Sequence, residues 1–263
     1  MARSWRDWGG QGSDRYADRR HAGRVLAQRL TALKDRDDVV VLGLPRGGVV
    51  VAYEVACELG APLDVLVVRK IGAPGREELA IGALATGDVL VFDERLARQF
   101  GVGPRELAAL KETAQRELER RERLFRGDRP PLEVDGKIVI VVDDGLATGS
   151  TMRAAVASLR ARHPKRIVVA VPVGPPPVCT ALTDEADEVI CALEPPAMYA
   201  VGAWYRDFTQ TSDEEVSRLL RAACPERWED QGCGPGSASA GAVDDDAAQT
   251  SQRLPGDDYP EDV

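Results

Sequence analysis

One stretch, residues 137–160, restricts the fold of this chain more than any other part of the sequence. Residues 138–142 (IVIVV) are all apolar, which is typical of a β-strand buried on both faces of a sheet. A polar loop with two glycines, Asp143–Thr151, follows this strand. Apolar side chains then recur at helical spacing, at Met152, Ala155, Val156 and Leu159. The order strand, loop, helix predicts an anion-binding site, because the loop amides and the helix N-terminus point to one spot.

The side chains of this loop indicate a phosphorylated ligand that also carries hydroxyl groups. The hydroxyls of Thr148, Ser150 and Thr151, together with backbone amides, can hold a monophosphate. Asp143 and Asp144 cannot bind phosphate, but their carboxylates can accept hydrogen bonds from sugar hydroxyls or attract a metal ion. The alternative is an ordinary strand-to-helix turn with a capping residue. Because a cap alone does not require two acids beside several small residues, the sequence favours a ligand site.

A second glycine-containing turn lies nearer the start of the chain. Val39–Leu44 is predicted to be another buried strand, and Val49–Leu59 is predicted to be a helix. Between them lies Pro45-Arg46-Gly47-Gly48, whose two glycines let the backbone approach a ligand closely. Arg46 supplies a fixed positive charge. A tight turn without a ligand is the alternative interpretation of so short a motif.

The next segment combines a strand, two cations and a glycine-containing stretch. Asp64–Val68 is predicted to be a strand, with Arg69 and Lys70 after it. Cations at the carboxyl end of a parallel strand face the ligand crevice, although solvated charges are the alternative. Ile71–Asp88 contains glycine and proline and no long apolar run, which predicts a mobile loop.

Two other segments have helical periodicity. Tyr16–Leu33 is predicted to be an amphipathic helix that covers one face of the core. Its arginines are expected to be solvated, with a phosphate-facing role as the alternative: Arg15, Arg19, Arg20 and Arg24. Pro104–Arg126 is predicted to be a long charged helix, because proline suits its first turn and its apolar stripe is narrow. Its charged surface is either solvated or packs on a partner subunit, so a homodimer is one expectation.

The last third of the sequence adds two strands, an aromatic segment and a helix. Ile167–Val173 and Glu188–Cys191 are predicted strands, and Ser212 is predicted to cap a final helix that runs through Leu220. The segment Ala197–Val216 precedes and enters this helix. It contains the clustered aromatic residues Tyr199, Trp204, Tyr205 and Phe208. They either cover a planar base or, as aromatic residues mostly do, pack in the core.

The charge distribution divides the chain of 263 residues into unequal parts. Residues 1–15 are predicted to be a flexible leader, and residues 16–228 a folded domain whose core draws on the 44% hydrophobic composition. Residues 229–263 contain nine acids, one base and few apolar groups, which predicts a disordered acidic tail. Most of the formal net charge of −9 belongs to this tail. The domain lacks the basic stripe of a nucleic-acid-binding surface, so no nucleic-acid partner is expected.

Composition also restricts the compartment and the metal chemistry. No apolar run reaches the length of a membrane span, and the start of the sequence has no apolar signal-peptide core. No membrane partner is therefore expected. The five cysteines form no C-x-x-C pair and there are two histidines, which disfavours a zinc site. Reduced thiols in a cytoplasmic protein are the simpler interpretation.

The stretch that ends in Asp143–Thr151 closely resembles the binding motif for phosphoribosyl diphosphate (PRPP) in type I phosphoribosyltransferases. That motif consists of a few hydrophobic residues, two acids and a T-G-x-T-like phosphate loop. The order of the P-R-G-G turn, the Gly/Pro segment and the acid-containing loop supports the resemblance, which covers residues 16–220. It implies an α/β fold with a mainly parallel sheet flanked by helices and a flexible hood. The whole chain is similar to a bacterial branch of the family rather than to a named salvage enzyme.

The resemblance implies that a nitrogen nucleophile, such as a nucleobase, displaces pyrophosphate from C1 of PRPP. Asp143 and Asp144 would hold the ribose hydroxyls, directly or through Mg²⁺ and its water. The 5′-phosphate would be bound by Ala147, Thr148, Gly149, Ser150 and Thr151. The leaving pyrophosphate would be held by Arg46, Gly47, Gly48 and Lys70. The predicted catalytic residues are Asp143, Asp144, Lys70 and Arg46, and the loop over residues 71–88 would close as a hood that excludes water.

Two other functions remain open at this point. Some members of the family bind PRPP or nucleotides as regulators and catalyse little, and the sequence does not separate this role from an enzyme. A metal held by the acid pair could also support hydrolysis of a phosphate ester. The absence of a His-rich or multi-acid cluster from the sequence counts against hydrolysis.

Ala147 bears on the identity of the acceptor. In oxopurine salvage transferases an Asp at this position of the loop serves as general base near the purine N7, and alanine can neither take a proton nor hydrogen-bond a base. The pattern D-D-G-L-A-T-G-S-T resembles instead the loop of adenine phosphoribosyltransferases, where an acid from the hood helps. Glu77 and Glu78 are the candidates for that acid, with simple solvation as the alternative. The resemblance therefore favours adenine or another amine over hypoxanthine and guanine.

Overall fold

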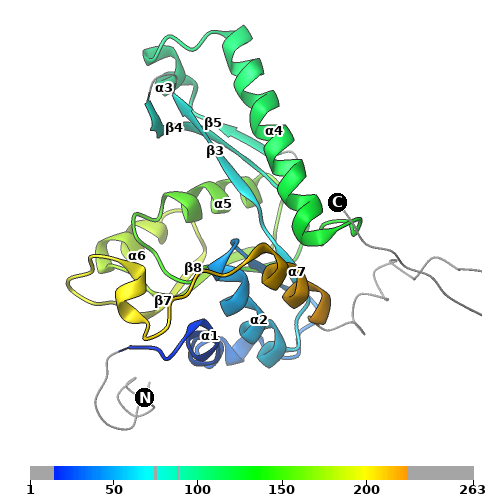
Figure 1. Cartoon of the computed structure of the whole chain (residues 1–263), viewed down its shortest axis with the longest axis vertical. Coiled ribbons are helices and arrows are strands. Elements are labelled where there is room, and N and C mark those ends of the chain that lie inside the picture. The colour runs from blue at the N-terminus through cyan, green and yellow to red at the C-terminus, as the bar shows by residue number, and fades with distance from the viewer. Residues whose placement is uncertain (1–14, 74–75, 88, 224–263) are drawn as a thin grey trace, which may run out of the picture. The chain divides into compact units, whose positions relative to one another are not determined.

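The computed structural model describes residues 15–73, 76–87 and 89–223, and these are built around a five-stranded sheet (Figure 1). In spatial order its strands are β2 (Leu63–Val65), β1 (Val39–Gly43), β6 (Ile138–Val142), β7 (Arg166–Val173) and β8 (Glu188–Leu193). All neighbouring strands are parallel. The predicted α/β fold with a mainly parallel sheet is confirmed. Residues 1–14 of the predicted leader and the whole predicted tail lie outside the described residues.

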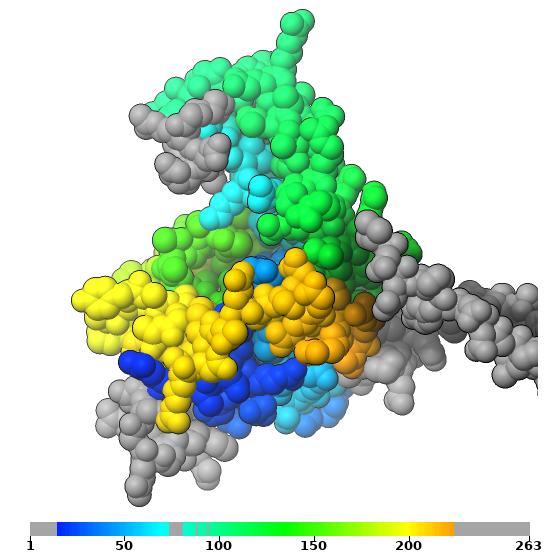
Figure 2. All heavy atoms as spheres, in the orientation of Figure 1, coloured from blue at the N-terminus to red at the C-terminus, as the bar shows by residue number. Residues whose placement is uncertain are grey.

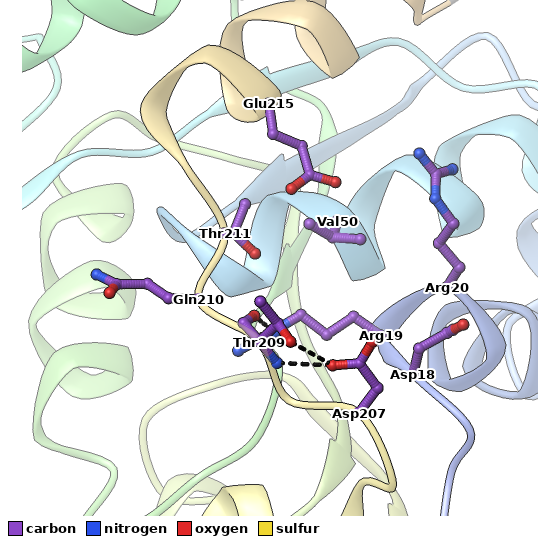
Figure 3. Close-up of a pocket in the computed structure, with 9 residues that line it drawn as sticks. All are labelled: Asp18, Arg19, Arg20, Val50, Asp207, Thr209, Gln210, Thr211 and Glu215. Atoms are coloured by element: carbon purple, nitrogen blue, oxygen red, sulfur yellow. Dashed lines mark hydrogen bonds between the residues drawn. The ribbon is translucent and has the colours of Figure 1, made fainter.

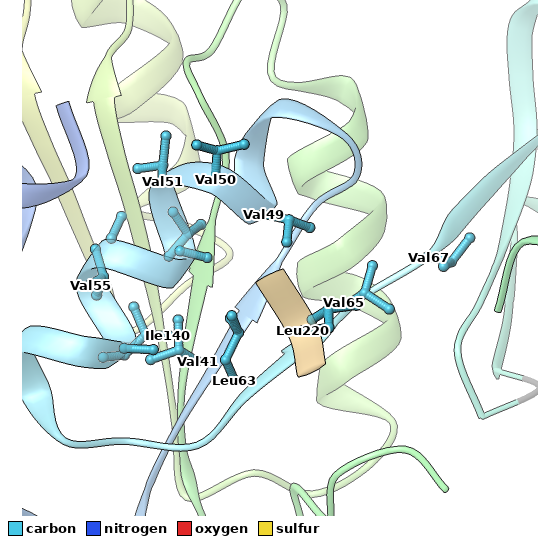
Figure 4. Packing of buried hydrophobic residues seen from close by; sticks show 14 of the residues in the cluster. Val41, Val49, Val50, Val51, Val55, Leu63, Val65, Val67, Ile140 and Leu220 are labelled. Carbon is cyan, nitrogen blue, oxygen red and sulfur yellow. The ribbon is translucent and has the colours of Figure 1, made fainter. Parts of the chain in front are cut away.

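Helices cover both faces of this sheet, because its strands are apolar on both sides. Val39 and Val41 of β1 pack with α1 (Arg19–Ala27), α2 (Gly47–Leu59) and α7 (Asp213–Ala222), and Figure 4 shows part of this layer. The alternate residues Val40 and Leu42 pack in a second layer. That layer contains α5 (Ser150–Arg160) and α6 (Pro176–Leu182). In the part of the chain that the structure describes, no helix combines the length and the apolar composition that a bilayer crossing requires.

The ends of the predicted helices agree only partly with the structure. The helix expected over Tyr16–Leu33 begins at Arg19, where Asp18 caps it by accepting a hydrogen bond from the His21 amide (2.7 Å). It ends at Ala27, and a short 3-10 helix, η2 (Thr31–Leu33), follows. The predicted cap of the last helix is confirmed, because the Ser212 hydroxyl accepts a hydrogen bond from the Glu215 amide (3.1 Å).

Residues 68–92 contribute a second, antiparallel sheet of three strands, β3 (Val68–Ala73), β4 (Arg76–Ala85) and β5 (Val89–Phe92). The prediction of a mobile loop over Ile71–Asp88 is therefore wrong. Its glycines permit strand pairing: a Cβ placed on Gly82 would lie 2.8 Å from the Val91 carbonyl oxygen of the neighbouring strand. Gly87 takes a positive φ of 86° in the turn between β4 and β5. These glycines interrupt the apolar pattern of the strands, which is why the pattern does not reveal them.

The predicted strand Asp64–Val68 divides between the two sheets. β2 ends at Val65, and β3 begins at Val68. The chain leaves the parallel sheet because Val67 pairs with Thr86 just beyond β4: its amide donates to the Thr86 hydroxyl, and its carbonyl accepts from the Thr86 amide, both at 3.0 Å. Arg69 and Lys70 consequently lie in an antiparallel strand, and not at the carboxyl end of a parallel strand as predicted.

Two helices, α3 (Glu94–Gln99) and α4 (Pro104–Arg126), follow the second sheet, and α4 packs against β3 and β4 (Figure 1). Most of the charged side chains on α4 form ion pairs along the helix itself, which agrees with a largely solvated surface. At its end, however, Arg126 is buried. Its Nε lies 3.0 Å from Oδ1 of Asp64, and both side chains are at most 3% exposed. This ion pair, which the helical pattern of the sequence does not indicate, fixes the end of α4 to β2.

Candidate functional site

The two loops singled out in the sequence lie side by side at the centre of the parallel sheet. β1 and β6 are neighbours whose last residues, Gly43 and Val142, are paired. The Leu44 amide donates to the Val142 carbonyl (2.9 Å), so the P-R-G-G turn starts beside the acid-containing loop. From β1 the chain continues to β2 on one side, whereas from β6 it continues to β7 on the other. Ligands of open α/β sheets bind at such a switch point, outside the carboxyl ends of the strands.

The glycines of the P-R-G-G turn allow the two loops to touch. A Cβ placed on Gly48 would lie 2.8 Å from the Cα of Asp143. A Cβ on Gly47 would overlap Oδ2 of Asp144. Both glycines belong to the first turn of α2, and a cis peptide bond joins Pro45 to Arg46. The sequence predicted that glycines here let the backbone approach a ligand. In this structure they let the backbone approach the two acids, Asp143 and Asp144.

The predicted phosphate loop surrounds a small cavity. The cavity has a volume of about 150 Å³, and the N-terminus of α5 lies at it. It is lined by Asp143, Gly145, Leu146, Ala147, Thr148, Gly149, Ser150, Thr151, Met152 and Val201. Gly149 precedes the helix with a φ of 72°, a left-handed conformation that favours glycine. All five residues predicted to hold a 5′-phosphate therefore line one cavity beside the first-turn amides of a helix.

The two predicted cations have different partners. The Lys70 ammonium of β3 donates to the Ser150 hydroxyl at 2.6 Å, so the second sheet brings this lysine to the phosphate loop. Arg46 lies 3.8 Å from Asp213 in the first turn of α7, and both side chains are a little over one third exposed. The structure therefore brings Lys70 to the loop expected for the 5′-phosphate, whereas Arg46 pairs with the first turn of α7.

The two acids are close together and largely removed from water. The Asp144 amide donates to Oδ1 of Asp143 at 2.8 Å. Burial raises the pKa of Asp143 well above its ordinary value, and the adjacent charge of Asp144 raises it further. Burial also raises the pKa of Asp144, although Arg19 opposes this shift. When both are ionised, two carboxylates beside one arginine carry an excess negative charge and present oxygen donors, which is a donor set that suits Mg²⁺.

A larger metal cluster is not found in the part of the chain that the structure describes. No group of three or more His, Cys, Asp or Glu side chains there could hold a metal ion. A cation at the acid pair would therefore need further oxygen ligands from its substrate or from water.

Arg19 belongs to this site, contrary to the prediction that it is solvated. Its side chain is 11% exposed, and its Nε lies 2.8 Å from Oδ2 of Asp144. The other arginines of α1 behave differently, since Arg20 and Arg24 pair with Glu54 on α2. One signal in the sequence could have identified Arg19. It shares the helical spacing i, i+3, i+7 with the buried residues Ala22 and Leu26.

The aromatic segment mainly supports this arginine. Tyr205 is buried against Tyr16, with ring centroids 5.5 Å apart, and its hydroxyl donates to the Asp144 carbonyl at 2.6 Å. Phe208 stacks on Tyr205 and carries the Arg19 guanidinium 3.8 Å from its ring centre. Tyr199, in contrast, is fully exposed. Core packing is thus the correct alternative for Tyr205.

Fold and site together define a class of protein. The parallel sheet of this class has a switch point that combines a glycine-containing loop at a helix N-terminus, a carboxylate pair and a glycine turn. Comparison with known proteins agrees with this class. The family model described as the phosphoribosyl transferase domain matches residues 13–194. The chain therefore belongs to this family, and the predicted relationship to type I phosphoribosyltransferases is confirmed.

Individual relatives extend over most of the chain. A protein of Mycobacterium tuberculosis H37Rv, named "Putative phosphoribosyl transferase", is 47% identical over 208 residues, which are 79% of this chain and 47% of the relative. The chain thus spans about half the length of the curated relatives it matches. The crystal structure of TT1426 from Thermus thermophilus is 43% identical, with a TM-score of 0.71 over 80% of this chain and 99% of that one.

Proposed function

We propose that this protein is a phosphoribosyltransferase that uses PRPP and Mg²⁺ to transfer a ribosyl phosphate to a nitrogen nucleophile, with release of pyrophosphate. One observation supports the proposal above all others. The acid pair, the glycine turn and the cavity of the phosphate loop meet at the ends of the adjacent strands β1 and β6. This arrangement offers sites for the three parts of PRPP, namely phosphate, ribose diol and pyrophosphate.

Each part of the site has a proposed role. The 5′-phosphate binds in the cavity lined by Ala147–Thr151, where the α5 amides and three hydroxyls can donate to it. Asp143 and Asp144 orient the ribose by accepting hydrogen bonds from its hydroxyls. The α2 amides at Gly47 and Gly48, with Arg46 and Lys70, stabilise the negative charge that grows on pyrophosphate as the bond to C1 breaks.

Mg²⁺ is expected at the acid pair, bound directly or through water. The ion would supply positive charge that neutralises the pyrophosphate oxygens. The chain's own contribution is to keep both carboxylates of Asp143 and Asp144 beside the ribose site. Asp144→Asn should therefore weaken Mg²⁺-dependent binding of PRPP, which calorimetry with the wild type and the variant measures. A wild type without Mg²⁺-dependent binding would sink the proposal, whereas equal binding by the variant would remove only the role of Asp144.

Adenine or another amine is the proposed acceptor. Ala147 lines the cavity with a methyl group and cannot act as the base that hypoxanthine and guanine require. The side chains of the candidate acids Glu77 and Glu78 lie outside the described residues, although their backbone belongs to β4. Release of pyrophosphate with each base and PRPP tests the proposal. Robust turnover of hypoxanthine would overturn it.

The same assay separates an enzyme from a regulator. A protein that binds PRPP tightly and releases no pyrophosphate with any base or amine acts as a sensor of PRPP. Release that depends on one acceptor identifies an enzyme and names its substrate.

A further inference from the structure

We infer that Arg19 is a positioning residue of the proposed PRPP site, which fixes Asp144 so that one carboxylate oxygen stays available to the ligand. The inference rests on the proposed function and adds a residue from the first helix to it. Arg19 Nε engages Oδ2 of Asp144 at 2.8 Å. Within the described residues, no side chain of another residue forms a hydrogen bond with Oδ1. Arg19 therefore leaves one oxygen for a ribose hydroxyl or a cation.

The guanidinium is held in place on three sides. Besides the bond to Asp144, its Nη1 donates to the Thr209 carbonyl at 2.8 Å. Its face lies 3.8 Å from the centre of the Phe208 ring, a distance typical of a cation–π contact. Figure 3 shows the side chain extending from α1 to Thr209. A side chain fixed by three contacts can hold a carboxylate in one orientation, because little rotational freedom remains to it.

These contacts require the shape of arginine. A planar guanidinium donates along two edges while its face stacks on an aromatic ring. A lysine ammonium at the same place could still pair with Asp144, but it has no planar face to lie on Phe208. We therefore expect Arg19→Lys to keep the charge and to lose part of the positioning.

Asp144 is held from its backbone as well. The Tyr205 hydroxyl donates to the Asp144 carbonyl at 2.6 Å. Tyr205 itself follows Trp204, whose carbonyl accepts from the Tyr16 amide at 2.8 Å. In Figure 2 the blue N-terminal segment lies beside the yellow segment on this face of the molecule. The segment that contains Tyr16 and Arg19 is thus hydrogen-bonded to the segment that contains Trp204 and Tyr205, and both segments contact Asp144.

The test compares Arg19→Gln and Arg19→Lys with the matched control Arg20→Gln. Arg20 is the next residue of α1, and it pairs with Glu54 instead of Asp144. The measurements are the melting temperature, the Kd of PRPP by calorimetry at several Mg²⁺ concentrations, and the crystal structure of Arg19→Gln. We expect Arg19→Gln to raise the Kd of PRPP about tenfold or more, since the charge-assisted hydrogen bond to Asp144, the acid expected to contact PRPP, is lost. Arg19→Lys should recover part of this loss, and Arg20→Gln should bind as the wild type does.

Each outcome decides the matter. A turned Asp144 carboxylate in the crystal structure of Arg19→Gln supports the inference, and an unchanged carboxylate overturns it. A lower melting temperature with an unchanged Kd also overturns it, because the role of Arg19 would then be structural. If the wild type binds no PRPP, the proposed function fails, and the crystal structure of the variant still decides whether Arg19 positions Asp144.

Discussion

Gly47 shows at the scale of one residue how closely the site is packed. Its Cα faces the ion pair, so that a side chain there would overlap Oδ2 of Asp144 and approach Nε of Arg19 to 2.7 Å. The P-R-G-G motif predicted a close approach to a ligand. The structure adds that the absence of a side chain already serves the contact between loops, before any ligand binds. The sequence could not reveal this use, because the contacting residues Arg19 and Asp144 are 28 and 97 positions away from Gly47 and lie in other elements.

Gly47→Ala should therefore weaken PRPP binding and lower stability, since the new methyl group displaces either Asp144 or the turn. Gly103→Ala is the matched control, because a Cβ on Gly103 would meet no atom within 4 Å and its φ is −80°. Calorimetry and thermal unfolding of both variants provide the measurement. Equal PRPP affinity of Gly47→Ala and the wild type would show that the two loops can separate without loss.

The acid pair gives a dependence of stability on pH. The folded state raises the pKa of Asp143 above its ordinary value of 3.8, so the folded protein binds this proton more tightly than the unfolded chain. Stability is therefore lost as the pH rises from that value through the folded pKa. Asp143→Asn should remove this loss, because the amide oxygen can still accept from the Asp144 amide and carries no charge.

The measurement is the free energy of urea unfolding against pH for the wild type, Asp143→Asn and the exposed control Asp128→Asn. We expect the advantage of Asp143→Asn over the wild type to be absent near pH 3 and to grow as the pH rises. Parallel curves for all three proteins would contradict this prediction. Mg²⁺ should reduce the advantage at neutral pH, since a bound cation offsets the repulsion of the wild-type carboxylates.

At the scale of elements, the sequence indicates the parallel strands well and the second sheet poorly. Residues 138–142 form a strand as predicted, because a short continuous apolar run is typical of a strand that is buried on both faces of a parallel sheet. Residues 68–92 do not reveal β3, β4 and β5, because small residues pair across these strands without a regular apolar pattern. The sequence also predicts that Arg19 is solvated, since arginine side chains are mostly exposed even on the helix face that carries buried residues.

The buried ion pair at the end of α4 fixes that helix to the parallel sheet. Arg126→Met would leave the Asp64 carboxylate, 2% exposed, without its cation, and we expect a loss of about 3–5 kcal/mol in the free energy of unfolding. The control is Arg116→Met on the same helix, which breaks an exposed pair with Glu112 and should cost under about 1 kcal/mol. Urea unfolding measures both.

A second variant separates loss of the charge pair from loss of packing. Asp64→Asn combined with Arg126→Met should recover part of the stability, because no unpaired charge then remains buried. A double variant as unstable as Arg126→Met alone would point to lost packing of the arginine stem instead.

At the scale of the whole molecule, amino-acid composition distinguishes residues 229–263 from the rest of the chain. The residues that form the sheets and the site lie between 16 and 223, whereas residues 229–263 contribute nine acids and few apolar groups. Deletion of residues 229–263 should leave the melting temperature and the PRPP affinity unchanged, because such a segment buries little apolar surface. A large drop in either quantity on truncation would show that this segment is docked.

The Arg19 contacts also have a consequence for the order in which the molecule is completed. Arg19 is 125 residues from Asp144 and 190 residues from Thr209 along the chain, so these contacts close very long loops. A growing chain cannot hold Asp144 in place until the segment that contains Tyr205, Phe208 and Thr209 has been made. Binding of PRPP at full affinity would then require that the segment with Tyr205, Phe208 and Thr209 has been synthesised and has folded against Arg19. A partly synthesised chain would contain the predicted phosphate loop and both acids, but the Asp144 carboxylate would not yet be fixed in place.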